Sequence, residues 1–177
     1  MIYFSADYHL FHRNIIKFCN RPFSSTQRMQ YHIWENHNHI VQPEDTVYFL
    51  GDLTMEGGSA RQKLDPLVDK LNGNLIMILG NHDRMKPFDY IEMGFSSVHT
   101  SLVIEVEGKK IFLCHDPAMI QPGIIPPEVD FALCGHVHTT WQKIDSFIPI
   151  INVGVDIWKF EPVNMLQILE LIGDRAD

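Results

Sequence analysis

The sequence has few cysteines, no long apolar run and no leader-like start, and each absence narrows the class of protein. Its three cysteines are an odd and sparse set in 177 residues, which argues against a disulfide framework. No apolar stretch approaches the roughly 18 residues of a membrane span, so we expect no membrane association. The apolar start at Met1–Phe4 lacks the basic segment and cleavage site of a signal peptide. We therefore expect a cytoplasmic protein.

Basic residues are also scarce. The chain has 14 Lys and Arg against 22 Asp and Glu, for a formal net charge of -8. An acidic protein repels long polyanions, so nucleic acid is not an expected general partner. Bound divalent cations would reverse the sign locally, so an acidic chain can still hold an electropositive site.

What the chain does contain is typical of a compact globular protein. Its hydrophobic fraction is 45% and its charged fraction 20%, which are ordinary values. The length suits a single core, and we find no internal repeat. We expect one domain spanning residues 1–177.

Apolar runs alternate with helical patterns in the first half of the sequence. A helix is expected from Ser25 or Thr26 to about residue 40, and another from a cap at Ser59 to about residue 71. Strands are expected at residues 2–6, 46–50 and 75–79. The order strand, helix, strand, helix, strand predicts a largely parallel sheet.

The second half is richer in strand patterns. Residues 102–106 and 110–113 flank Gly108 and predict a hairpin. Further apolar pieces occupy residues 131–134 and 146–153, and a final helix is expected from residue 162 to about 172. Two packed sheets with helices outside accommodate both halves.

Polar residues follow these apolar runs in a repeated way. They comprise Asp7 and His9, Asp52, the Asn81-His82-Asp83 run, His115, and the pair His136 and His138. Functional sites in open α/β sheets form beyond the carboxyl ends of strands. Five strand ends are therefore expected to present these side chains to one crevice.

Carboxylate, imidazole and amide groups together are typical ligands of Mn, Fe or Zn rather than of a soft metal. Two neighbouring cations need a bridging carboxylate, and Asp52 follows a central strand. Asp7 and His9 are two residues apart, as are His136 and His138, so an extended backbone would point each pair one way. Alone, Gly-Asp is frequently a turn and a single histidine is frequently a surface residue. The prediction of a metal site therefore rests on the whole set of residues in this order.

This set resembles the calcineurin-like metallophosphoesterase superfamily over nearly the whole chain, and most closely its small bacterial and phage branch of phosphohydrolases. The opening Asp-x-His-x-x-His-x-Asn-Ile-Ile stands at residues 7–16, Arg-Pro-Phe at 21–23 and Asn-Val-Gly-Val-Asp at 152–156. Ala6 occupies a position where many relatives have serine, which removes no ligand.

The resemblance implies a fold and a metal centre. The implied fold is a four-layer α/β/β/α sandwich of two mixed β-sheets flanked by helices. The implied centre holds two divalent metal ions, with Mn expected first and Fe, Zn, Ni and Co as alternatives. The first metal would be held by Asp7, His9 and His138, the second by Asn81, His115 and His136, and both by Asp52.

The resemblance also implies the chemistry. The substrate would be a small phosphate ester, with a phosphodiester favoured because Gly-Asn-His-Asp resembles the diesterase side of the superfamily. A hydroxide shared by the two metals would attack phosphorus in line. His82 would be the catalytic histidine that protonates the leaving oxygen or binds a phosphoryl oxygen, and Asp83 would orient it.

Other interpretations compete with this one. A silent scaffold of the same fold should have lost ligands, whereas every ligand position is filled. A structural zinc site favours four ligands rich in Cys, which this set is not. His12 either touches substrate or supports the site, and the basic segment from Arg13 to Arg28 either guides a phosphate-bearing substrate or is a solvated face. The other histidines of the long helix, His32, His37 and His39, are expected at the surface.

Overall fold

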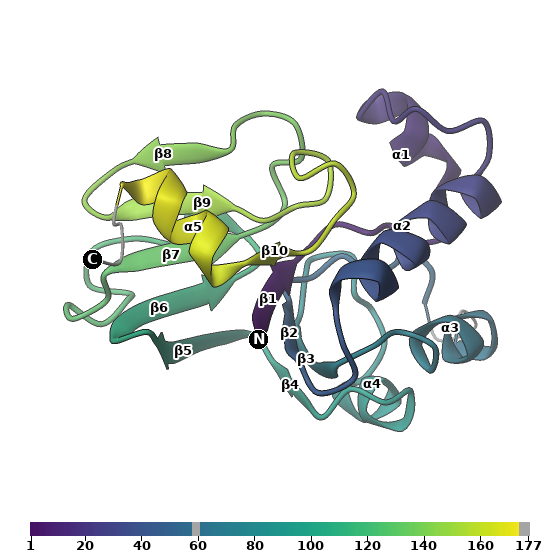
Figure 1. Ribbon diagram of the computed structural model, residues 1–177, viewed down its shortest axis with the longest axis horizontal. Helices are drawn as coiled ribbons and strands as arrows, with labels where there is room; N and C mark the ends of the chain where they lie inside the picture. Colours follow the sequence, from purple (N-terminus) through teal and green to yellow (C-terminus); the bar gives the residue numbers. More distant parts are fainter. Residues whose placement is uncertain (58–60, 174–177) are drawn as a thin grey trace.

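The computed structural model of the protein describes residues 1–57 and 61–173, and Figure 1 shows its arrangement. The helices are α1 (Arg13–Phe18), α2 (Thr26–Ile40), α3 (Arg61–Val68), α4 (Pro87–Glu92), the 3-10 helix η2 (Pro117–Met119) and α5 (Met165–Ile172). The strands are β1 (Ile2–Ser5), β2 (Thr46–Phe49), β3 (Asn74–Ile78), β4 (Ser97–His99), β5 (Ser101–Val106), β6 (Lys109–Cys114), β7 (Phe131–Cys134), β8 (Lys143–Asp145), β9 (Pro149–Asn152) and β10 (Val163–Asn164).

The first sheet has the strand order β10-β1-β2-β3-β4. Strands β1 to β4 run parallel, and β10 pairs antiparallel with β1. Helix α2 begins where the sequence predicted, since the Ser25 side chain accepts the Arg28 N–H at 3.3 Å. Helix α3 runs through the region predicted for the second helix, and the predicted cap, Ser59, lies outside the described residues. The predicted parallel sheet is confirmed.

The second sheet has the order β5-β6-β7-β9-β8. The predicted hairpin is the antiparallel pair β5 and β6, whose turn has left-handed backbone at Glu107 and Gly108. Strands β6, β7 and β9 run parallel, and β8 closes the edge in the antiparallel direction. Both sheets are therefore mixed, as expected.

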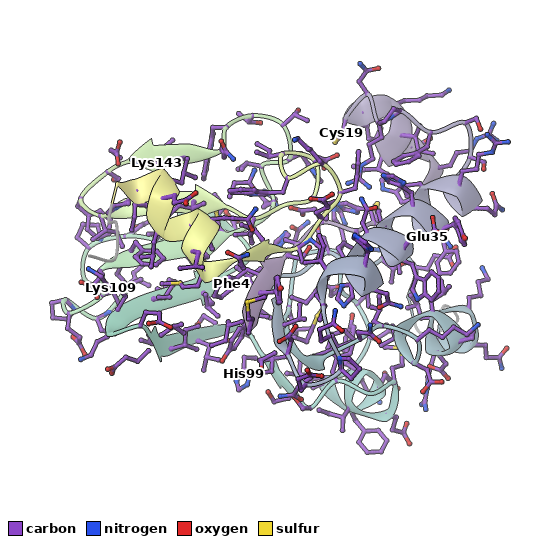
Figure 2. The ribbon with its side chains drawn as sticks, in the orientation of Figure 1. Phe4, Cys19, Glu35, His99, Lys109 and Lys143 are labelled. Atoms are coloured by element: carbon purple, nitrogen blue, oxygen red, sulfur yellow. The ribbon has the colours of Figure 1, made fainter. Side chains whose placement is uncertain are left out.

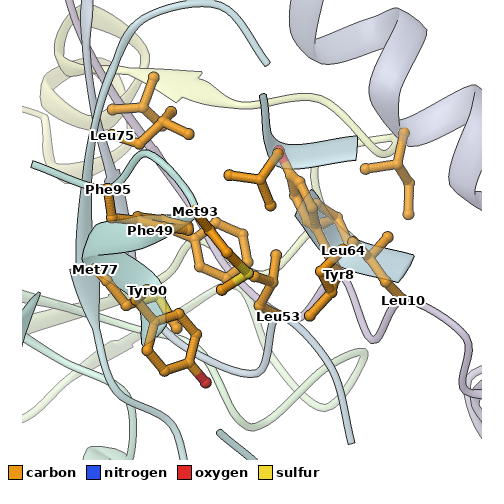
Figure 3. Packing of buried hydrophobic residues seen from close by; sticks show 14 of the residues in the cluster. Tyr8, Leu10, Phe49, Leu53, Leu64, Leu75, Met77, Tyr90, Met93 and Phe95 are labelled. Carbon is orange, nitrogen blue, oxygen red and sulfur yellow. The ribbon is translucent and has the colours of Figure 1, made fainter. Parts of the chain in front are cut away.

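The layers follow from which side chains each strand buries. Successive strand residues face opposite sides, so Tyr3 packs on the outer, helix-covered face of the first sheet and Phe4 packs between the sheets. Figure 3 shows part of the outer layer, where Tyr90 and Phe95 pack edge to face at 5.9 Å. Figure 2 labels Phe4 in the layer between the sheets.

The outer faces of the two sheets are covered by different kinds of segment. Helices α1 to α4 contribute to the core on the outer face of the first sheet, and α5 adds Ile168 and Leu169 to the core between the sheets. The outer face of the second sheet packs instead against Ile120, Ile125 and Val129, in the segment after η2. Within residues 1–57 and 61–173, no helix is both long enough and apolar enough to cross a membrane.

Candidate metal centre

The carboxyl ends of the two sheets meet at one place. The bridge between Ala6 and Gly154 joins the end of β1 to the segment after β9, and Val155 donates to Ala6 O at 3.1 Å. Asp7 N–H donates to Gly51 O at 2.9 Å, and Gly135 N–H donates to His115 O at 3.1 Å. These links gather the segments after β1, β2, β6 and β7, so the predicted site residues converge.

Asp52 lies at the centre of this convergence. Its Oδ2 lies 3.5 Å from His9 Nε2, 3.3 Å from His115 Nε2 and 4.0 Å from His82 Nε2. Its Oδ1 accepts the backbone N–H of His82 at 3.0 Å, which fixes the carboxylate. One oxygen is thus held by the backbone, and the other faces imidazole nitrogens from three different segments.

One group of possible ligands surrounds the buried His9. Atoms of Asp7, His9 and His138 lie within 4.8 Å of one another, and His9 Nε2 is 4.0 Å from Asp7 Oδ1. Asp7 is 0% exposed and His9 is 1% exposed. Both ring nitrogens of His9 are buried without a hydrogen-bond partner. A buried polar nitrogen without a partner is costly unless it binds a group outside the protein.

A second group surrounds Asn81. Its Oδ1 lies 3.1 Å from His115 Nε2 and 3.0 Å from His136 Nδ1. His115 Nδ1 donates to Leu50 O at 2.7 Å, which leaves Nε2 without its proton when the ring is neutral. Ligand atoms at right angles around a cation with bonds of about 2.1 Å lie about 3 Å apart. The distance from Asn81 Oδ1 to each of the two imidazole nitrogens therefore fits ligands of a shared divalent ion.

The backbone at the site differs from the sequence expectation. Extended segments were expected to align Asp7 with His9 and His136 with His138, but all four residues have positive φ, of 62°, 50°, 72° and 47°. Asp52 does also, at 58°. The expectation of an extended backbone was wrong, although the side chains do converge. Asp and His tolerate this left-handed region better than bulky residues do.

Two glycines admit the Asp7 carboxylate. A Cβ at Gly154 would lie 2.6 Å from Asp7 Oδ2, and one at Gly135 would lie 2.8 Å from the same oxygen. Asp7 also accepts the backbone N–H of His136 at 3.0 Å, across the two sheets. Gly135 and Gly154 therefore allow close packing against the Asp7 carboxylate, and the backbone N–H of His136 orients this carboxylate.

The electrostatics of the centre follow from burial and pairing. Burial raises the pKa of Asp7 to about 6, although nearby His115 and His138 oppose the rise. Burial also disfavours the Asp52 carboxylate, but the hydrogen bond and charge of His115 outweigh it and bring its pKa to about 2. Burial lowers the pKa of His9 to about 3, which keeps it neutral. A neutral imidazole is the form that binds metal.

The remaining predicted residues lie at the rim. The His82 side chain is 29% exposed, and the His82 and His12 rings lie 5.6 and 5.5 Å from the His9 ring. The expectation that Asp83 orients His82 was wrong. Its carboxylate instead accepts backbone N–H groups of Asp52 at 2.6 Å, Gly80 at 2.8 Å and Leu53 at 3.0 Å. It therefore ties together the loops after β2 and β3.

The structure also adds residues that were not assigned a role from sequence. Asp156 Oδ2 lies 3.0 Å from His138 Nδ1, and Arg21 pairs with the same carboxylate. Arg21 is only 4% exposed, so it is not part of a solvated basic face. Both residues belong to sequence motifs, Arg21 to Arg-Pro-Phe and Asp156 to Asn-Val-Gly-Val-Asp, but the sequence did not show that these two motifs are in contact. Cys19, labelled in Figure 2, offers a sulfur within 4.8 Å of ligand-type atoms of His138 and Asp156.

One histidine of the long helix was assigned wrongly. His37 was expected at the surface but is 1% exposed. Its ring contacts the Tyr8 hydroxyl and the Asn72 carbonyl oxygen. His32 and His39 are exposed as expected.

The comparisons with known proteins agree with this geometry. The calcineurin-like phosphoesterase superfamily domain matches residues 6–165. The chain belongs to this superfamily. An uncharacterized protein of Methanocaldococcus jannaschii is 34% identical over 175 residues, covering 97% of this chain and 90% of that protein. The gene 66 protein of Mycobacterium phage D29 is 26% identical over 197 residues, covering 98% and 96% of the two chains.

Solved structures extend the comparison to the fold of this superfamily member. A protein of unknown function from Aquifex aeolicus has a TM-score of 0.76 and 28% identity, covering 97% of this chain and 98% of that chain. A structure described as a novel archaeal phosphodiesterase has a TM-score of 0.52 and 17% identity, covering 86% and 82%. The latter likeness concerns the fold alone. The resemblance drawn from the sequence is thus confirmed.

Proposed function

We propose that this superfamily member is a phosphoesterase that depends on two divalent metal ions and hydrolyses phosphodiesters, with phosphomonoesters as a second substrate class. Membership of the superfamily supports a phosphoester hydrolase in general. The observation that carries the metal proposal is His9, a buried imidazole with two unpartnered nitrogens beside the carboxylates of Asp7 and Asp52.

The proposed ligands fit such a centre in their chemistry and spacing. Asp7, His9 and His138 form one group of donor atoms, and Asp7, Asp52 and His115 form another. In the proposal, Asp7, His9 and His138 would hold the first ion, and Asp52 would be a ligand shared with the second. Asn81, His115 and His136 complete the second set.

Both proposed ligand sets contain only oxygen and nitrogen donors, which favours Mn and accommodates Fe, Zn, Ni or Co. When bound, two such ions supply Lewis acidity, which lowers the pKa of a water and offsets charge on phosphoryl oxygens.

The protein's own side chains would provide the remaining chemistry. His82 is proposed to donate a proton to the leaving oxygen or a hydrogen bond to the phosphoryl group. Its ring is partly exposed, so a substrate can reach it, while its backbone N–H is fixed on Asp52. His12 is proposed to contact the substrate as well, because its ring lies 5.5 Å from the His9 ring, about as close as that of His82.

The experiment that tests this function starts with metal-free protein. Mn²⁺ is restored, and chromogenic diester and monoester substrates are assayed in parallel with an Asp52→Asn variant. Asparagine keeps an oxygen that can accept the His82 N–H but removes the bridging charge. Asp130→Asn is the matched control, because Asp130 is an exposed carboxylate at the amino end of β7 that accepts Lys110 N–H at 2.7 Å.

We expect Mn-dependent turnover that falls at least about 100-fold in Asp52→Asn, since the charge offset at the phosphoryl group is among the largest catalytic effects. Asp130→Asn should retain wild-type turnover. The diester-to-monoester ratio then identifies the preferred substrate class. Equal turnover in wild type and Asp52→Asn would refute the proposed role of the centre.

A further inference from the structure

Arg21 forms a buried ion pair with a residue far away in the sequence. Its Nε and Nη2 donate to the two oxygens of Asp156, at 2.7 and 2.9 Å. The Arg21 side chain is 0% exposed and that of Asp156 is 1% exposed. A bidentate contact of this kind fixes the relative orientation of the two side chains as well as their distance.

The same guanidinium also holds the backbone of the first ligand loop. Nη2 donates to Asp7 O at 2.7 Å, and Nη1 donates to Tyr8 O at 3.0 Å. These carbonyls belong to the segment that runs from Asp7 to His9. Because that segment has left-handed backbone at both ends, fixed carbonyls determine where its side chains point.

Asp156 extends the contact to the third proposed ligand of the first ion. Its Oδ2 lies 3.0 Å from His138 Nδ1. A carboxylate can only accept, so Nδ1 of a neutral His138 carries the proton and Nε2 is left with its lone pair. The Asp156 contact thus selects the ring nitrogen that remains available for a metal.

We propose that Arg21 and Asp156 are positioning residues that hold Asp7, His9 and His138 as one unit and thereby control occupancy of the first metal position. The inference builds on the proposed function, because it assumes a dinuclear centre. It also excludes Arg21 as a direct contact of substrate phosphate, since each of its nitrogens already donates within the buried core.

The proposed second position is oriented by other contacts. His115 is set by Leu50 O, and Asn81 faces His115 and His136. Among the described residues, the hydrogen bonds of Arg21 reach Asp156, Tyr8, Met29 and Asp7, and none reaches this second group directly. A change in the Arg21–Asp156 pair should therefore weaken binding of the first ion and leave binding of the second unchanged.

The test counts metal ions instead of measuring turnover. Metal-free wild type, Asp156→Asn and Arg21→Lys are titrated with Mn²⁺ by calorimetry, and the bound ions are examined by electron paramagnetic resonance. Arg21→Lys keeps the charge but loses the fork that spans Asp156 and the two carbonyls. Asp45→Asn is the control, since Asp45 is a buried carboxylate that accepts Gln42 N–H at the amino end of β2, away from the site.

We expect wild type and Asp45→Asn to bind two ions. In Asp156→Asn and Arg21→Lys the affinity for one of the two ions should fall 10- to 100-fold. This is roughly the range for loss of a residue that orients a metal ligand. The spectrum should lose its coupled dinuclear signal and match that of His138→Ala, not that of His136→Ala.

Two unaltered ions in both variants would overturn the inference and leave the proposed function intact. A wild type that binds no ion would overturn both. If Asp156→Asn does not fold, Arg21→Lys carries the same test, with circular dichroism as the check on folding.

Discussion

Loss of His37 is expected to change how the stability of the protein depends on pH. His37 is buried in α2, where its Nδ1 lies 3.0 Å from the Tyr8 hydroxyl and its Nε2 lies 2.8 Å from Asn72 O. The carbonyl can only accept, so Nε2 carries the proton and Tyr8 donates to Nδ1. Tyr8 stands between Asp7 and His9, so this neutral imidazole also supports the first ligand loop.

The sign of the effect follows from the direction of the pKa change. Burial lowers the pKa of folded His37 from 6.5 to about 4, with the Asn72 contact opposing the fall. Between these pH values the unfolded chain binds more protons than the folded one, so stability falls as pH falls. At about 1.36 kcal/mol per pKa unit, this group removes about 3 kcal/mol between pH 7.5 and pH 4.

The assay compares urea unfolding of wild type and His37→Gln at pH 7.5, 6, 5 and 4, with chelator present so that metal does not contribute. At pH 7.5 the variant should be less stable, because it loses the paired ring. The difference in unfolding free energy should then shrink by about 3 kcal/mol at pH 4, since glutamine does not titrate. His39→Gln, on the exposed face of the same helix, should follow the wild-type profile. A difference that stays constant over this pH range would refute a buried neutral His37.

Three further changes test the site and its support. Gly154→Ala would place a Cβ 2.6 Å from Asp7 Oδ2; metal titration should show affinity at least about tenfold weaker, whereas Gly57→Ala, with open space around it, should leave affinity unchanged. Asp83→Asn replaces one of two acceptor oxygens by a donor facing backbone N–H groups; urea unfolding should show a loss of about 2–3 kcal/mol, and an unchanged midpoint would contradict this. Metal removal should lower the melting temperature, because an ion at 100 times its Kd adds about 2.7 kcal/mol; equal melting curves with and without chelator would show that no ion binds the folded state tightly.

The parts of the fold that could be predicted were those with strong local patterns. The runs at residues 2–6, 46–50 and 75–79 are almost wholly apolar, as strands covered on both faces must be. The structure has β1, β2 and β3 there, within one residue at each end. Because such strands end where polar residues begin, the same reading also predicted the positions of the site residues along the chain.

Short elements that depend on distant partners were missed. Strand β10 is two residues long and exists because Asn164 and Val163 pair with β1. Strand β4 and helix α4 are likewise too short to show a periodic pattern. Their stability comes from tertiary contacts, such as Tyr90 against Phe95, which no local window contains.

The residues that orient the proposed ligands could not be predicted from the sequence for a related reason. Arg21 and Asp156 are 135 residues apart, so their pairing is invisible to any reading of local spacing. His37 was different, since a signal was available. Met29, Ile33 and His37 recur every four residues on α2 and are all buried, so the helical period itself placed His37 on the apolar face.

The proposed ligands adopt a backbone that the protein must stabilise elsewhere. Left-handed φ at Asp7, His9, Asp52, His136 and His138 costs about 1 kcal/mol at each residue. Such strain persists only where surrounding contacts determine the conformation. The structure supplies these contacts from two sides, since Asp83 holds the loop of Asp52 and Arg21 holds that of Asp7 and His9. These left-handed turns follow β1, β2 and β7 and return the chain toward the common centre directly after each strand, which brings five of the seven proposed ligands together over few residues.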